Sequence, residues 1–294
     1  MADHKHKDIA DLPKNSLAMD TWKRLLKNKA AVFGGIVMIA LICMAVFADF
    51  IYDYKTQVIA QNIPQRLIKP CLERPFGTDE FGRDLLARVV YGSRMSLTVS
   101  FTSVAISLTV GGLVGAIAGF YGGKIDNVLM RVTDILLAIP MTLFAIVIVA
   151  ALGANTTNLA IALAASSIPI FARIVRGAVL TVRDEEYIEA ARAIGASNFT
   201  ILFKHVLPNC LSPIIVQVTL RIANAIYNTA ALSFLGMGVQ APAPEWGGLL
   251  ASGRQYIRDY SYLSIIPGLS IMLTVLALNL LGDGLRDALD PRLK

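Results

Sequence analysis

The sequence predicts an all-α membrane protein with six transmembrane helices. Of its 294 residues, 55% are hydrophobic and only 16% are charged, and the mean hydropathy is +0.60. A soluble globular domain carries about 25% charged residues, so this chain has too little charge to cover a water-facing surface. Several charge-free stretches are long enough to cross about 30 Å of hydrocarbon. The same composition excludes intrinsic disorder, collagen and a disulfide scaffold.

Residues 1–29 are rich in Lys and Arg and precede the first apolar run. A long basic lead-in of this kind is typical of a cytoplasmic segment before an uncleaved span, rather than of a secretory signal peptide. The first transmembrane helix is expected over residues 30–52, because Ala30 to Ala48 carries no charge. Residues 53–94 are charged and contain three prolines, so they are expected to form an external loop.

A core of five further helices is expected within residues 95–282. Met95 to Gly123 is rich in Gly, Ser and Thr, which let helix backbones approach closely in a membrane. A single span is expected from Asn127 to Leu152, where Arg131 and Asp134 lie on one helix face and are expected to pair near the membrane surface. The remaining spans are Leu159–Leu180, Leu211–Leu235 and Tyr262–Gly282, followed by a cytoplasmic tail over residues 283–294.

The distribution of charge predicts the orientation of these spans. Six spans put both termini on one side of the membrane, together with the segment 183–208. Lys and Arg are about twice as numerous in the connections on that side as on the other, which predicts that both termini are cytoplasmic. The net charge of +6 is therefore attributed to cytoplasmic loops, and no nucleic-acid partner is expected.

The segment 183–208 is too polar to span a membrane and too apolar to be a plain linker. Glu185 to Ile194 predicts a helix with Glu in its first turn, and Gly195 is a natural helix stop. A second helix is expected from Ser197 to Val206, ending at Pro208. The sequence therefore predicts a helix, a glycine turn and a second helix outside the bilayer.

Small residues on the first of these helices suggest a contact surface. Ala190 and Ala191 are expected to leave a shallow face, with Glu189 and Arg192 at its rim for charge contacts. One interpretation is a helix that docks into a socket on another protein. The alternative is an amphipathic helix lying on the membrane surface, and the physical pattern alone leaves both open.

The spacing around these alanines resembles a known signature. Glu189-Ala190-Ala191, then Gly195, then His205-Val-Leu-Pro-Asn209 resembles the EAA motif of ABC importer permeases. Other segments resemble the C-type permease of the dipeptide, oligopeptide, glutathione and nickel branch of that family. They are Phe76–Asp84, Leu232–Gly238, Pro244–Gly247 and Gly282–Pro291.

This resemblance implies the type I ABC importer permease fold with a cytoplasmic coupling helix, in a bacterial inner membrane. It implies four kinds of partner: a second homologous permease, two ATP-binding subunits, an extracytoplasmic substrate-binding protein and a peptide substrate. In such families the EAA helix docks in a cleft of the ATPase, and that role is carried over to Glu189, Ala190, Ala191 and Gly195. The implied mechanism is alternating access, driven by ATP.

The chain itself is not expected to be an enzyme. It has no G-x-x-x-x-G-K-[ST] sequence, so ATP and Mg are expected on partner subunits, and no catalytic residue or cofactor is assigned to this chain. Its three cysteines show no CxxC spacing, so no metal site is expected either. An ion-coupled secondary transporter is an alternative from another class, but it calls for a buried acid near the membrane midplane, and none is present there.

Arg221 lies roughly 15 Å into the fifth span, at 1.5 Å per residue, which is near the membrane midplane. Asn224 and Asn228 follow on the same helix face. Because an ionisable residue at this depth usually faces a cavity or a partner, this face is expected to line the translocation path, with Arg221 meeting substrate carboxylates. The alternative is an arginine that pairs with a backbone carbonyl or polar group of the neighbouring permease.

Two further questions stay open at the level of sequence. The external charges Asp79, Glu80, Arg83 and Asp84 either contact the binding protein or partner permease, or pair with one another in a solvated loop. The cargo is also open, because a nickel or metal-chelate importer is the nearest alternative to a peptide importer.

Overall fold

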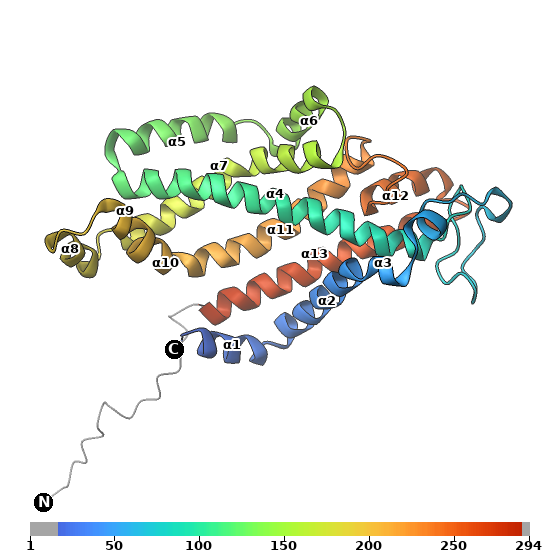
Figure 1. Cartoon of the computed structure of the whole chain (residues 1–294), viewed down its shortest axis with the longest axis horizontal. Coiled ribbons are helices and arrows are strands. Elements are labelled where there is room, and N and C mark those ends of the chain that lie inside the picture. Colours follow the sequence, from blue (N-terminus) through green and yellow to red (C-terminus); the bar gives the residue numbers. More distant parts are fainter. Residues whose placement is uncertain (1–16, 290–294) are drawn as a thin grey trace, which may run out of the picture.

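The computed structural model describes residues 17–289, and the regular elements in that range are helices. Five long helices run along the longest axis of the molecule (Figure 1). They are α2 (Lys29–Val46), α4 (Leu85–Tyr121), α7 (Thr156–Val182), α11 (Leu211–Phe234) and α13 (Tyr262–Leu289). The shorter α-helices are α1 (Leu17–Lys27), α3 (Ala48–Ile51), α5 (Gly123–Leu137), α6 (Met141–Leu152), α8 (Glu186–Ala193), α9 (Asn198–Thr200), α10 (Leu207–Asn209) and α12 (Trp246–Gly253).

Four shorter segments have tighter or wider helical turns. Two are 3₁₀-helical, η3 (Ile63–Gln65) and η5 (Arg254–Tyr256), and two are π-helical, η2 (Tyr54–Val58) and η4 (Ile201–Val206). Figure 1 places α8 to α10, α1 and the last turns of α13 at one end of the molecule. The segment before α4 and helix α12 lie at the opposite end.

Four of the long helices, α2, α4, α7 and α13, are long and apolar enough to cross a membrane. Two bent pairs also qualify if each is counted as one span: α5 with α6, and residues Asn198–Asn209 with α11. The described chain therefore has four to six candidate spans, and the predicted all-α membrane fold is confirmed.

Helix α4 begins at Leu85 rather than at Met95, so the last part of the expected external loop 53–94 is helical. Asp84 caps the helix, because its Oδ1 atom accepts a hydrogen bond from the backbone N–H of Ala87 at 3.0 Å. The basic residue Arg88 lies inside this first part, and its Nη1 atom donates to the Val58 carbonyl at 3.0 Å. A charge that is buried with partners does not end a helix, although it ends an apolar run in the sequence.

The expected span from Asn127 to Leu152 is not one continuous helix, because the chain bends by 84° between α5 and α6, and the pair forms either a broken span or a re-entrant loop. Pro140 stands at the bend with φ −53° and ψ 128°, which is extended backbone. Proline lacks the N–H that a continuous helix needs, and its ring disfavours a helical residue before it. The break follows from this residue.

The expected pairing of Arg131 with Asp134 is wrong. Asp134 instead accepts from Arg173 of α7 at 2.6 Å. Asp126 accepts two hydrogen bonds from Arg176 of α7, at 2.5 and 2.6 Å. Both acidic residues of α5 therefore face α7, and they hold α5 against it.

Helices α4 and α7 meet along a seam of glycines. Gly111, Gly115 and Gly119 recur every four residues on α4 and therefore share one face. A Cβ atom on Gly115 would stand 2.9 Å from the Ala172 carbonyl carbon, and one on Gly119 would stand 3.0 Å from the Arg176 oxygen. The absence of side chains at these positions lets the two backbones touch, as the sequence predicts for this span.

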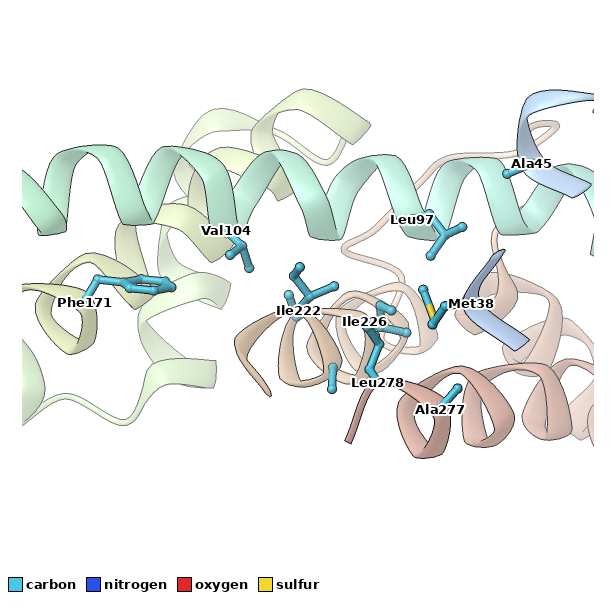
Figure 2. Packing of buried hydrophobic residues seen from close by; sticks show 11 residues of the cluster. Met38, Ala45, Leu97, Val104, Phe171, Ile222, Ile226, Ala277 and Leu278 are labelled. Carbon is cyan, nitrogen blue, oxygen red and sulfur yellow. The ribbon is translucent and has the colours of Figure 1, made fainter. Parts of the chain in front are cut away.

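One buried cluster joins all five long helices. Figure 2 shows Met38 of α2, Leu97 of α4, Phe171 of α7, Ile222 of α11 and Leu278 of α13 among its members. Phe171 is completely buried in this cluster. A core shared in this way fixes the helices relative to one another and positions the surfaces described next.

Candidate functional site

Residues 183–208, which we call the coupling segment after their expected role, are anchored to the ends of three long helices. Ile188 of α8 is fully buried and Ala191 is 8% exposed. Both belong to a cluster that also holds Phe120 of α4, Val179 of α7 and Ile214 of α11. A movement of α8 is therefore passed directly to these helices, because close-packed side chains cannot slide past one another freely.

Helix α8 ends in a Schellman motif. The N–H of Ala196 donates to the Ala191 carbonyl at 3.1 Å, and the N–H of Gly195 donates to the Arg192 carbonyl at 3.0 Å. Gly195 has a φ of +85°, a conformation that a residue with a Cβ atom adopts at a cost of about 1–2 kcal/mol. The predicted glycine stop is confirmed, since α8 ends at Ala193.

The second half of the coupling segment is less regular than expected. It runs through α9, η4 and α10 to Asn209, one residue beyond Pro208. Ser197 caps its start, because its Oγ atom accepts from the Thr200 N–H at 3.2 Å. The π-helical turn of η4 buries Ile201 and Val206 in the cluster beneath α8. The π-helical hydrogen bonds of η4 interrupt the regular α-helix here, and both side chains point into the cluster.

The expected face formed by Ala190 and Ala191 together is wrong. Ala190 is exposed, whereas Ala191 packs inward beneath α8. The exposed surface at the tip of the segment, which we call the apex, is nevertheless strongly apolar. It comprises Ala190, Ala193, Ile194, Phe199 and Phe203.

Two apex residues are large and almost fully open. Ile194 is 85% exposed and Phe199 is 70% exposed, and the Phe199 and Phe203 rings lie 4.5 Å apart between centroids. Exposed apolar side chains gathered in this way mark a contact with a protein or with the membrane surface, so the two interpretations of this segment both account for the apex. Ile194 and Phe199 are functional candidates that the sequence did not single out, because Ile194 lies just beyond the end of α8 and Phe199 lies in the short helix α9.

Charged residues surround the apex. Glu189 is exposed beside Ala190, as expected. The Arg192 guanidinium lies 5.7 Å from the centroid of the Phe120 ring, so this arginine turns toward α4. Arg183 donates to the Gly119 carbonyl at 2.7 Å and tethers the start of the segment. Burial, followed by the charge of Glu185, raises the pKa of Tyr187, so this residue stays uncharged at neutral pH.

A second candidate site is a polar pocket of about 650 Å³ between α5, α7 and α11. Arg221, Gln217 and Arg173 line it, together with Thr181. The Nε atom of Arg221 is buried, and within residues 17–289 it has no hydrogen-bond partner. Burying such a donor unpaired is costly, so an acceptor that reached this atom would be favoured.

The three residues expected on one path-lining face separate in the structure. Arg221 is partly open and Asn224 is exposed, but Asn228 is only 8% exposed and points into the chain. Asn224 donates to the Leu220 carbonyl at 2.8 Å, and Asn228 donates to the Asn224 carbonyl at 2.9 Å. The polar residue that lines the pocket together with Arg221 is Gln217, one helical turn earlier, and not Asn228 as expected.

Two family models match the chain, and together they cover most of it. A family model described as "binding-protein-dependent transport system inner membrane component" matches residues 111–294. The N-terminal transmembrane domain of oligopeptide transport permease C matches residues 16–70. The chain belongs to the binding-protein-dependent inner-membrane permease family. The predicted family is thereby confirmed.

Curated relatives of this permease resemble it along almost their whole length. A dipeptide transport system permease protein of Alkalihalophilus pseudofirmus is 48% identical over 275 residues, covering 94% of this chain and 90% of the relative. A di/tripeptide transport system permease protein of Pseudomonas aeruginosa is 44% identical, covering 93% and 91%. A glutathione transport system permease protein of Pectobacterium atrosepticum is 43% identical, covering 93% and 90%.

A solved structure supports the same fold. The chain superposes on the inward-facing methionine ABC transporter MetNI with a TM-score of 0.59 and 20% identity, covering 70% of this chain and 98% of the other. The permease is a multi-pass inner-membrane protein and the non-catalytic component of its transport system. A system of this kind includes an ATPase and a binding protein.

The charged residues of the segment before α4, which is expected to be external, pair with one another. The Asp79 carboxylate lies 2.6 Å from Arg83 Nε and 3.3 Å from Arg88 Nε, and all three residues are buried. Asp84 pairs with Arg74 at 3.0 Å. These pairs agree with the alternative in which the charged residues pair with one another. The centre of the cluster, however, is buried rather than exposed to solvent. Arg88, which the sequence reasoning did not include, joins the cluster to α4.

Proposed function

We propose that this permease imports di- and oligopeptides, glutathione among them, across a bacterial inner membrane. In this proposal it forms the translocation path with a second homologous permease. Two ATP-binding subunits carry ATP and Mg, and an extracytoplasmic binding protein delivers the peptide. The names of the relatives support the peptide cargo. A nickel or metal-chelate importer remains the alternative within the family.

The observation that carries the proposal is the construction of the coupling segment. Its base is buried among α4, α7 and α11, while its apex presents apolar side chains away from the membrane helices. In this proposal an ATPase binds the apex, contacts Ala190 at its surface and Glu189 at its edge, and thereby moves these helices together. Ala191 and Gly195 contribute differently, because Ala191 seats α8 and Gly195 ends it.

The proposed topology follows from the same arrangement. Residues 1–29, the coupling segment and the tail 283–294 are cytoplasmic, so both termini lie on the side of the ATPase. The first transmembrane helix lies within residues 30–52, and the external segment runs from residue 53 to the start of α4. The other helices of the permease core lie within residues 95–282.

The polar pocket is the proposed contact for cargo within the path. Gln217, Arg221 and Asn224 form an open polar strip on a helix of membrane-spanning length. Polar and charged groups at that depth are unfavourable against lipid, which supports a path-facing position. The free Nε atom of Arg221 supports the assignment of this residue to a peptide carboxylate.

The cargo is tested by uptake into proteoliposomes that contain the purified transporter and its binding protein. We expect a labelled dipeptide to accumulate only with ATP, and excess unlabelled dipeptide to inhibit this uptake. Glutathione is expected to compete as a tripeptide. Competition by a nickel chelate, with none by peptides, would favour the metal alternative, and accumulation driven by an ion gradient without ATP would contradict the whole proposal.

Arg221→Gln tests the path. A hydrogen bond to a charged group is worth about 1.5–3 kcal/mol, so we expect dipeptide uptake to fall about tenfold to a hundredfold. Arg258→Gln removes the same charge from an exposed position in the connection before α13 and is expected to leave uptake unchanged. Loss of the second permease from the purified Arg221→Gln complex would instead assign Arg221 to the contact between permeases.

A further inference from the structure

Helix α1 carries an exposed apolar face directly before the first membrane-spanning helix. Trp22 is 58% exposed, Leu26 is 53% exposed and Met19 is 50% exposed. These positions are spaced by three and four residues, so they lie on one side of the helix. Asn28 separates α1 from α2 and caps α2 through its Oδ1 atom, which fixes where the spanning helix begins.

The opposite side of α1 is fastened to the rest of the chain. Leu25 is buried in a small cluster with Ala31 of α2 and Ala288 of α13. A Cβ atom on Gly284 would stand 3.3 Å from Leu25 Cδ1, so the absence of a side chain there makes room for this contact. Figure 1 shows α1 beside the ends of α2 and α13. The fold therefore sets the direction in which the apolar face points.

Basic residues flank that face. Lys23 and Lys27 are one helical turn apart and both are exposed. The helix carries three basic residues against one acidic residue. A helix with an apolar face that contains a tryptophan and a basic flank is suited to the boundary between lipid headgroups and acyl chains.

We propose that α1 is a preformed binding surface for anionic phospholipid. Trp22 and Leu26 enter the headgroup boundary of the leaflet at the end of the molecule where the coupling segment lies. Lys23 and Lys27 contact the lipid phosphates. The charge complementarity selects anionic over zwitterionic lipid, at about fivefold in local affinity for each lysine. This role is independent of the cargo, and it fits the position of α1 immediately before α2.

The two tryptophans of the chain allow a direct test. Trp246 is completely buried and donates to the Val89 carbonyl at 3.0 Å, so Trp22 is the only exposed one. The full-length permease, purified in its transporter complex, is placed in nanodiscs that contain brominated phosphatidylglycerol or brominated phosphatidylcholine at the same mole fraction. Bromine quenches tryptophan emission at short range. Subtracting the signal of Trp22→Phe isolates Trp22 from every other tryptophan in the complex.

We expect brominated phosphatidylglycerol to quench Trp22 more strongly than brominated phosphatidylcholine. The double variant Lys23→Gln/Lys27→Gln is expected to abolish this difference while both lipids still quench. Lys55→Gln/Lys69→Gln removes two exposed lysines near the opposite end of the chain and is expected to keep the difference. Equal quenching by both lipids in the wild type overturns the charge selection. An absence of quenching by either lipid overturns the membrane contact and means that another subunit covers α1.

Discussion

Replacing Ala190 with arginine is expected to abolish most ATP-driven uptake by this permease. Ala190 is exposed in the apolar apex, directly after Glu189 and about one helical turn before the open side chain of Ile194. A long charged side chain there holds an ATPase surface away from the apex. Central contact residues carry about 2–4 kcal/mol, so we expect a loss of about a hundredfold, measured as peptide uptake in proteoliposomes.

The same substitution at a distant exposed alanine serves as the control. Ala154 lies in the turn before α7, at the other end of that helix from the coupling segment, and Ala154→Arg is expected to transport normally. The ATPase is expected to co-purify less well with Ala190→Arg and fully with Ala154→Arg. Normal uptake and full ATPase recovery with Ala190→Arg would refute the assigned role of the apex.

Replacing Gly115 with alanine is expected to destabilise the permease itself. The new Cβ atom would stand 2.9 Å from both the Ala172 carbonyl carbon and the Arg176 backbone nitrogen of α7. Backbone atoms cannot rotate out of the way, so α4 and α7 have to separate. Overpacking of this kind costs about 1–3 kcal/mol, which is measurable as a lower midpoint of thermal unfolding in detergent.

Gly112→Ala is the matched control, because the substitution lies on the same helix only three residues away. A Cβ atom there meets nothing nearer than Val175 Cγ2 at 3.8 Å and Leu108 Cδ1 at 3.9 Å. Alanine favours a helix over glycine by about 1 kcal/mol, so this variant is expected to be as stable as the wild type or more stable. If both variants lower the midpoint equally, the seam between α4 and α7 is not the cause.

Much of the fold can be predicted from composition, because runs without charge mark the long helices. The errors arose where tertiary contacts compensate a charge or where a residue interrupts the backbone. The charge-free run begins after Arg94, yet this residue lies inside α4, where Asp49 and the Ala45 carbonyl are its partners. Arg88, six residues earlier in α4, has Asp79 and the Val58 carbonyl as partners. Pro140 was visible in the sequence, but the size of the bend depends on how α5 is paired with α7 through Arg173 and Arg176.

The sequence predicted where the candidate site lies, but it predicted only some of the residues that are exposed there. The spacing of Ala190, Ala191 and Gly195 located the coupling segment. Helical periodicity alone does not say which of two adjacent alanines faces inward, since both border the apolar stripe. Ala191 is buried because Ile188 and the turn of η4 fix the rotation of α8. Asn228 is buried for a similar reason, because α11 is rotated by its contacts in the shared core.

The unequal packing around α7 decides where the protein is able to bend. On one side, glycines and close backbone contacts join α7 to α4, and separating the two helices would lose this packing. On the other side, α7 and α11 share the buried core, but an open pocket of about 650 Å³ lies between them beside Gln217 and Arg221. We therefore expect α4 and α7 to move as one rigid pair when the coupling segment moves, and α11, which is anchored to the same segment, to move with them. The open pocket beside Arg221 is expected to change shape more readily than the close-packed contact between α4 and α7.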